Sequence, residues 1–222
     1  RRHATAIVRI VLEKELRLDL GKYLDHARTL IVECGIKGTP DSEEHGSRRV
    51  TDFVFERLRH YGRTVHAFRD DVMDAVLRPA SAGPIDLLDL LSKLKAVQGV
   101  TAKPDFDPLI VGFKRASRII EKEQWDRKPV DAGMFKEAAE QDLHRQIRAC
   151  QQDFEQHMAE GCYDRALNVL VRLKPAIDAF FEGVMVNVDD AALRSNRLSL
   201  LKEVSDCFTS FADFSRIVVQ GG

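Results

Sequence analysis

Two arginines near the C-terminal end of the chain stand in a segment whose apolar spacing predicts a helix from about Asp190 to Phe214. At 3.6 residues per turn, Arg197 falls in the middle of the apolar arc of this helix and Arg194 falls at its edge. An arginine in an apolar stripe is costly unless its guanidinium is paired. We therefore expect Arg197 to form a buried ion pair, with Asp178 of the preceding hairpin as the first candidate partner.

Arg194 and Asn196 are better placed for a ligand outside the chain. Arginine donates hydrogen bonds as a fork, and asparagine both donates and accepts at one base edge. Single-stranded RNA bases are recognised by stacking and by hydrogen bonds to their edges. The neighbouring aromatic residues Phe180 and Phe181 have the spacing of a helix core, so we expect them to pack inside the protein. Arg194 and Asn196 are thus the predicted base or sugar contacts.

A second cluster of cations lies on one face of an earlier predicted helix. It consists of Lys114, Arg115, Arg118 and Lys122. These residues lie about 100° to 200° around the helix from Phe113, the centre of its apolar face. One interpretation is an ordinary solvated face, with Glu121 and Glu123 as counter-charges. The other is a phosphate-facing surface, which would release counterions from RNA and make binding depend on salt.

Motifs of catalysis are absent from the sequence. It contains no glycine-rich phosphate loop, no HExxH, no GxSxG and no Cys/His spacing suited to zinc. Asp70 and Asp71 are neighbours in a predicted helix, where their side chains would point about 100° apart, so their spacing does not make a catalytic dyad. We predict no catalytic residue, no metal site and no cofactor in this chain, which would bind a ligand without transforming it.

Composition narrows the class of protein further. The 222 residues are 44% hydrophobic and 31% charged, as in soluble globular proteins, and the apolar runs are too short to span a bilayer. The net charge of −1 excludes a strongly basic coat for nucleic acid, so any RNA contact must come from a local patch. Four widely separated cysteines indicate reduced thiols of a cytoplasmic protein. Because the chain lacks an initiator Met and a visible signal peptide, we expect a fragment of a longer polypeptide.

Helical periodicity dominates the chain and predicts an all-α fold, most simply a helical bundle. The run Arg78–Pro84 contains two prolines, a glycine and small residues, which is typical of a boundary. We therefore expect a smaller helical segment over residues 1–80 and a larger helical domain over residues 84–222. The core of the larger domain is expected over about 135–220.

Several stretches resemble the C-terminal part of the bacterial glycyl-tRNA synthetase β subunit, which ends in a DALR-type anticodon-binding domain. The resemblance is carried by Ile177-Asp-Ala-Phe-Phe-Glu-Gly-Val-Met-Val-Asn, Leu193-Arg-Ser-Asn-Arg-Leu-Ser-Leu-Leu and Ala212-Asp-Phe-Ser, and upstream by Phe113-Lys-Arg-Ala-Ser-Arg-Ile-Ile, Phe55-Glu-Arg-Leu-Arg, Asp71-Val-Met-Asp-Ala-Val-Leu and Ala6-Ile-Val-Arg-Ile-Val. It covers nearly the whole chain. The family's usual asparagine before the lysine–arginine pair is replaced here by Phe113 or Gly112.

This resemblance implies a noncatalytic part of a synthetase that attaches glycine to its tRNA. In that family the α subunit supplies the catalytic core, which uses ATP and magnesium, and the β subunit positions glycine tRNA within an α2β2 tetramer. The terminal helical domain reads the anticodon, and residues 1–80 would hold the tail of an HD-like domain with linker helices. In that setting Lys114, Arg115 and Arg118 would contact the RNA backbone, and Arg194 and Asn196 a base or sugar.

Two other functions fit the same sequence. One is a helical scaffold for subunit assembly, with RNA bound elsewhere. The other is the corresponding domain of another DALR-bearing synthetase, such as the arginyl or cysteinyl enzyme. The upstream similarities disfavour this last reading, because those enzymes should diverge before the terminal bundle.

Overall fold

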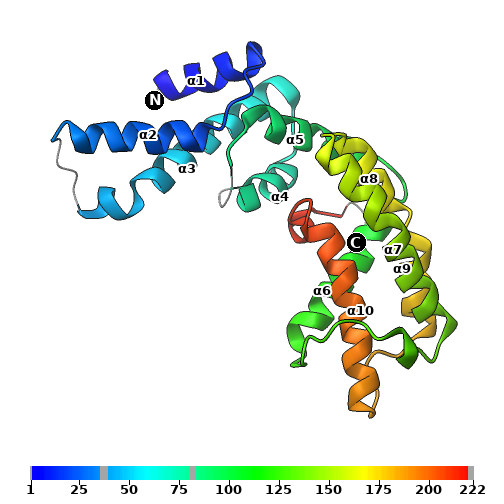
Figure 1. The fold of residues 1–222 in the computed structure, drawn as a ribbon. Coiled ribbons are helices and arrows are strands. Elements are labelled where there is room, and N and C mark those ends of the chain that lie inside the picture. Colours follow the sequence, from blue (N-terminus) through cyan, green and yellow to red (C-terminus); the bar gives the residue numbers. More distant parts are fainter. Residues whose placement is uncertain (1, 36–39, 81–83, 220–222) are drawn as a thin grey trace. The chain divides into compact units, whose positions relative to one another are not determined.

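The protein is described by a computed structural model over residues 2–35, 40–80 and 84–219. Within these ranges the chain forms α-helices, two short 3₁₀ helices and connecting loops, and no residue lies in a β-strand (Figure 1). The prediction of an all-α fold is confirmed.

The chain divides into two compact units, residues 1–95 and residues 96–222. The division falls inside helix α5 (Leu87–Thr101), later than the boundary expected at residues 80–84. The residues that follow Pro84 are tied to the first unit. The Ile85 amide donates to the Asp19 carboxylate at 3.1 Å, and the Ile85 carbonyl accepts from the Leu20 amide at 2.8 Å.

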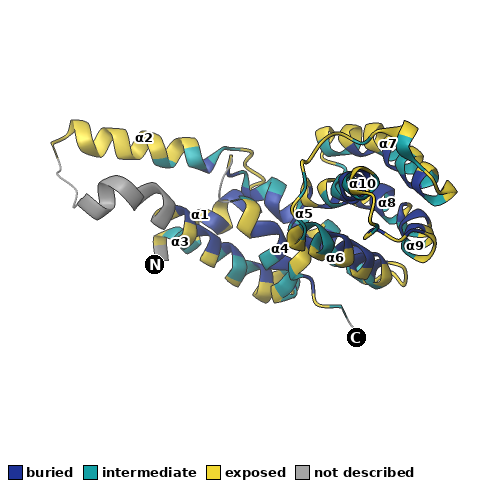
Figure 2. Cartoon of the chain, turned by 90° about the horizontal axis from the view of Figure 1, so that it is seen from below, coloured by how far each residue is buried: buried dark blue, intermediate teal, exposed yellow. Residues whose placement is uncertain are grey.

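The first unit is built around one long helix. This unit contains α1 (Arg2–Glu13), α2 (Leu20–Glu33), α3 (Pro40–His66), α4 (Asp70–Ala80) and the first part of α5. Helix α3 packs against α1, α2 and α4. Asp19 caps the N-terminus of α2, where its side chain accepts from the Gly21 amide at 3.0 Å. Most residues of α2 are exposed (Figure 2).

The second unit is a helical bundle. It contains α6 (Phe106–Lys122), η1 (Ala132–Met134), α7 (Ala138–Ala159), α8 (Tyr163–Val171), α9 (Lys174–Gly183), α10 (Ala191–Thr209) and η2 (Phe214–Arg216). Helix α10 packs against α6 and α7, α7 packs against α8 and α9, and α6 also contacts α9 and η2. Helix α10 is largely buried among its neighbours, as Figure 2 shows. Its apolar pattern continues into η2, which is why the sequence predicted one helix as far as Phe214.

An aromatic cluster joins α6, α10 and η2. Phe113, Phe208 and Phe214 are fully buried, and their ring centroids are 5.1 Å apart for Phe113 and Phe208 and 6.0 Å apart for Phe208 and Phe214. Burying one such side chain contributes roughly 1.5–3 kcal/mol of transfer free energy. The cluster therefore fixes the segment after α10 against α6, a placement that matters for the surface described below.

The backbones of α6 and α9 approach each other closely at Gly112. A Cβ added at this glycine would lie 2.9 Å from Ile177 Cγ2, a contact shorter than folded proteins tolerate. Ile177 is itself buried and β-branched, so it has little freedom to move away.

We predict that Gly112→Ala lowers the free energy of unfolding by about 1–3 kcal/mol, because overpacking outweighs the better helix propensity of alanine. The matched control is Gly99→Ala in α5, where an added Cβ meets nothing within 4 Å. That variant should gain roughly 0.5–1 kcal/mol from propensity alone. Urea unfolding followed by circular dichroism measures both changes, and equal stability of the two variants would contradict the close approach.

Candidate nucleic-acid interface

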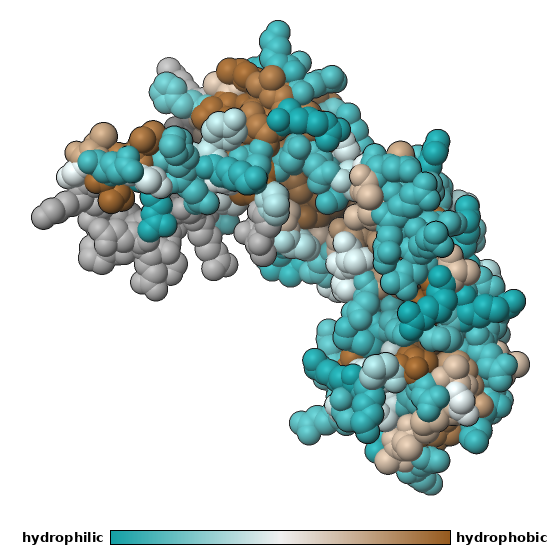
Figure 3. All heavy atoms as spheres, viewed as in Figure 1, coloured by the Kyte–Doolittle hydropathy of each residue, from teal (hydrophilic) through white to brown (hydrophobic). Residues whose placement is uncertain are grey.

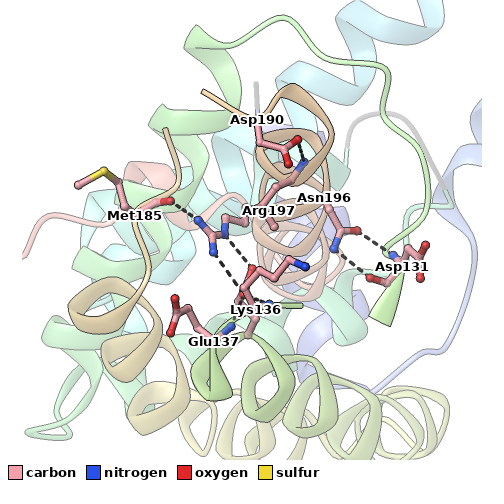
Figure 4. Close-up of polar contacts among 9 residues, drawn as sticks. Asp131, Lys136, Glu137, Met185, Asp190, Asn196 and Arg197 are labelled. Atoms are coloured by element: carbon pink, nitrogen blue, oxygen red, sulfur yellow. Dashed lines mark hydrogen bonds and ion pairs between the residues drawn. The ribbon is translucent and has the colours of Figure 1, made fainter. Parts of the chain in front are cut away.

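Arg197 of α10 is buried and fully engaged by protein groups. Its Nε donates to Glu140 Oε1 at 2.8 Å, and its Nη1 donates to the Met185 carbonyl at 2.7 Å (Figure 4). The ion pair expected at Arg197 is therefore present, but the expected partner Asp178 is wrong. Asp178 is half-exposed and pairs with Lys174 one turn earlier in α9.

Glu140 is the fully buried partner of this pair, and it also holds the start of α7. Its Oε2 accepts from the backbone amides of Lys136 at 2.8 Å and Glu137 at 2.7 Å. Burial by itself would raise the pKa of Glu140, but the hydrogen bonds from Arg197 and from the two amides outweigh it and lower that pKa below its ordinary value of 4.5. The carboxylate is therefore charged at neutral pH and neutralises Arg197.

Asn196 faces the interior, and the expected base or sugar contact from this residue is wrong. Its Oδ1 accepts from the Asp131 amide at 2.8 Å, and its Nδ2 donates to the Asp131 carbonyl at 3.0 Å (Figure 4). Both ends of the side-chain amide are committed to one backbone residue, and Asn196 is buried. It therefore acts as a clamp on the loop between α6 and α7.

That loop, residues 123–137, is fastened along α10 by further side chains. The Ser199 hydroxyl donates to the Lys128 carbonyl at 2.6 Å, and the Ser195 hydroxyl donates to the Asp126 carboxylate. Hydrogen bonds from Lys128 first, and then from Ser195, lower the pKa of Asp126 to about 2. Sequence reasoning missed this clamp. The available signal was the run of small polar residues beside Arg197, opposite a long loop with no helical pattern of its own.

Arg194 is half-buried at the edge of α10, as its position in the helix predicted. Its Nη1 donates to the Val188 carbonyl at a long distance of 3.3 Å. Because a guanidinium carries five N–H donors, this single contact leaves capacity for a ligand. Its predicted contact with RNA stays a prediction.

The three α6 cations that were predicted to face phosphates have different surroundings in the structure. Arg115 is exposed and lies over the Phe181 ring, with 4.3 Å between its Cζ and the ring centroid. Lys114 instead points to the C-terminal segment, where its Nζ donates to the Ile217 carbonyl at 2.7 Å. Arg118 is exposed one turn after Lys114. Phe181 thus supports a surface cation by cation–π contact, whereas Phe180 is fully buried.

Lys114 and Arg118 line a groove between α6 and the C-terminal segment, which we call the basic groove. Its volume is about 450 Å³, and it is lined by Val111, Lys114, Arg118, Ser215, Arg216, Ile217, Val218 and Val219. The face of the second unit visible in Figure 3 is mostly hydrophilic with small apolar patches.

The described residues contain no group of three or more His, Cys, Asp or Glu side chains that could hold a metal ion. None of the helices in the described ranges has the length and apolar character needed to cross a membrane. Cys150 and Cys207 line a pocket between α7 and α10, where burial raises the pKa of the Cys207 thiol to about 11, so this thiol is protonated at neutral pH.

Residues 109–213 match the family model of the DALR anticodon binding domain. The match runs from the first turn of α6 to the residue before η2, so it includes the Arg197–Glu140 pair and the α6 wall of the basic groove but not the wall formed by residues 215–219. The second unit is thus similar to domains of the DALR anticodon-binding class.

The similarity to known proteins extends over nearly the whole chain. Glycine–tRNA ligase β subunits are 33% identical in Sulfurihydrogenibium sp. over 218 residues, 34% in Delftia acidovorans over 218 residues and 37% in Solidesulfovibrio magneticus over 227 residues. These alignments cover 98–99% of the chain and 28–31% of each relative. The chain is therefore a homologue of the glycine–tRNA ligase β subunit, and it spans about three tenths of the length of these relatives.

We predict that Glu140→Gln, which keeps the shape of the side chain but leaves Arg197 with no counter-charge, lowers the free energy of unfolding by about 3–5 kcal/mol at pH 7. Because the folded-state pKa of Glu140 is lowered, the stabilisation by its charge is complete above pH 4.5 and is lost as the pH falls through the folded pKa. The gap between wild type and variant should therefore narrow below pH 4.5.

Urea titrations at pH 7 and at pH 3.5 measure this gap. Glu155→Gln is the control, since it neutralises an exposed carboxylate of the same helix and should leave the unfolding midpoint unchanged. A gap that is the same at both pH values would contradict the assignment of the charge to Glu140.

Proposed function

We propose that this chain is the tRNA-binding, anticodon-recognising part of a glycine–tRNA ligase β subunit. The observation that carries the proposal is the DALR anticodon-binding match over residues 109–213, within a chain that resembles these β subunits along almost its full length. The exposed cations of α6 and the edge of α10 give that match a surface with the right charge for RNA.

The proposed division of labour separates the interior of the bundle from its surface. Inside, Arg197 and Asn196 are satisfied by protein groups and hold α7, α10 and the loop between α6 and α7 in place. Outside, Lys114, Arg115 and Arg118 contact phosphates, and Arg194 contacts a base or sugar. Preorganised cations lose little conformational freedom on binding, so a chain with a net charge of −1 can still attract RNA at one patch.

The proposed partners follow from the same family. Glycine tRNA is the ligand, and an α subunit completes the enzyme as a tetramer of two α and two β subunits that acts in the cytoplasm. ATP and magnesium serve the aminoacylation step on that α subunit, and we assign no residue of this chain to either. The part of the reaction proposed for this chain is positional, because gripping the anticodon arm brings the acceptor end of the tRNA to a distant active site.

Removal of the α6 cations tests the phosphate contacts. We predict that Lys114→Ala, Arg115→Ala and Arg118→Ala together weaken glycine tRNA binding roughly tenfold or more and reduce the slope of log Kd against log salt by about 0.7–0.9 per lost contact. The matched control is Arg145→Ala, Arg165→Ala and Arg172→Ala, which removes the same charge from exposed positions on α7, on α8 and at the end of α8. Equal affinity and salt slope in the two triple variants would refute the α6 assignment.

Substitution of the anticodon separates the proposed function from its alternatives. We predict that glycine tRNA with a substituted anticodon binds roughly tenfold more weakly than the native tRNA, because lost base-edge hydrogen bonds leave polar groups unpaired. The fluorescence of Trp125, the only tryptophan of the chain, provides a readout without labels. Binding that ignores the anticodon would favour a scaffold role, and preference for arginine or cysteine tRNA would favour another DALR-bearing synthetase.

A further inference from the structure

The basic groove has one wall formed by α6 and one formed by the segment that follows η2. Two buried side chains fix the second wall, since Phe214 belongs to the aromatic cluster and Ile217 is also fully buried. The hydrogen bond from Lys114 Nζ to the Ile217 carbonyl then joins the two walls at 2.7 Å. The residues between these anchors, Ser215 and Arg216, are therefore held at the groove rather than left as a loose tail.

Three cations converge on this groove. Arg118 is exposed, and Lys114 uses one of its three N–H donors on the Ile217 carbonyl. Arg216 is oriented by Asp213, which accepts from its Nε at 2.7 Å and leaves the forked end of the guanidinium beyond that contact. With Asp213 as the single paired carboxylate, the lining carries a net charge of about +2 at neutral pH.

Two exposed apolar side chains also line the groove. Val111 and Val218 are 54% and 62% accessible, on opposite walls of the groove. A site that combines forked cationic donors with exposed aliphatic side chains matches the chemistry of a nucleotide, whose phosphate is anionic and whose ribose and base offer apolar faces. An acidic peptide would satisfy the cations but would gain less from the two valines.

We propose that the basic groove binds a phosphodiester of single-stranded RNA, with Arg118 and Arg216 on the phosphate and Val111 and Val218 against the adjoining ribose or base. This assignment rests on the proposed function, because the RNA is the bound tRNA. It adds Arg216 and the C-terminal segment to a surface that sequence reasoning confined to α6 and α10. Lys114 acts as a positioning residue that holds the second wall and adds charge.

The test uses the 222-residue chain with a glycine tRNA transcript. Arg118→Gln with Arg216→Gln should weaken binding roughly tenfold and reduce the salt slope by about 1–2, whereas the control Arg145→Gln with Arg172→Gln should bind as wild type does. In addition, a photo-crosslinking amino acid at position 218 should capture the tRNA, and the same group at Ala149 on the exposed face of α7 should not.

Each outcome of these experiments supports or overturns the proposed binding of RNA in the basic groove. If the double variant binds tRNA as tightly as wild type, the assignment of the groove to RNA is overturned while the proposed function stands. Crosslinking at position 149 but not at position 218 leads to the same conclusion. Failure of the wild-type chain to bind any tRNA overturns both. Displacement of the tRNA by poly-glutamate at a lower concentration than by a single-stranded RNA oligonucleotide would assign the groove to an acidic protein partner and overturn the RNA assignment.

Discussion

The buried ion pair between Arg197 and Glu140 is the constraint on which the second unit depends. It joins α10 to the first turn of α7, and through the Met185 carbonyl it also fixes the turn that precedes α10. Glu140 accepts two backbone amides at the same time, so the pair and the start of α7 form together. Because neither charge reaches water, removing one partner strands the other in a medium that solvates it poorly. Such a pair contributes modest net stability when intact, whereas the loss of one partner is strongly destabilising.

The same few turns of α10 also hold the loop between α6 and α7, through Ser195, Asn196 and Ser199. The inner face of this helix is thus occupied by protein contacts, which leaves ligand recognition to the outer surface of the bundle. There the cations of α6 are held by internal structure as well. Arg115 rests on Phe181, and Lys114 is tied to the segment after η2. The buried network and the exposed charges are therefore linked, because the packed interior fixes the positions of the cations on the surface.

Sequence reasoning was sufficient where a local pattern carried the information. Periodicity gave the all-α fold, and the place of Arg197 in an apolar stripe gave its burial. The ion-pair partner of Arg197 was not predicted, because Glu140 lies 57 residues away and has the pattern of an ordinary residue in the first turn of a helix. Asn196 was assigned to a ligand for the same reason, since its clamp on Asp131 depends on a long loop returning to α10. Arg216 was missed because its place in the basic groove depends on the burial of Phe214 and Ile217 on either side. Tertiary contacts of this kind leave no periodic signal.

The account requires Arg197 to serve the fold rather than to touch RNA. The most direct measurement combines Glu140→Gln with Arg197→Met, which removes both charges and keeps an acceptor for the amides of Lys136 and Glu137. Unfolding free energy and affinity for glycine tRNA are then compared with those of wild type and of each single variant. The account predicts a double variant that is more stable than either single variant and that binds tRNA as wild type does. A double variant that folds but loses tRNA affinity would show that Arg197 contacts the RNA and would contradict the account.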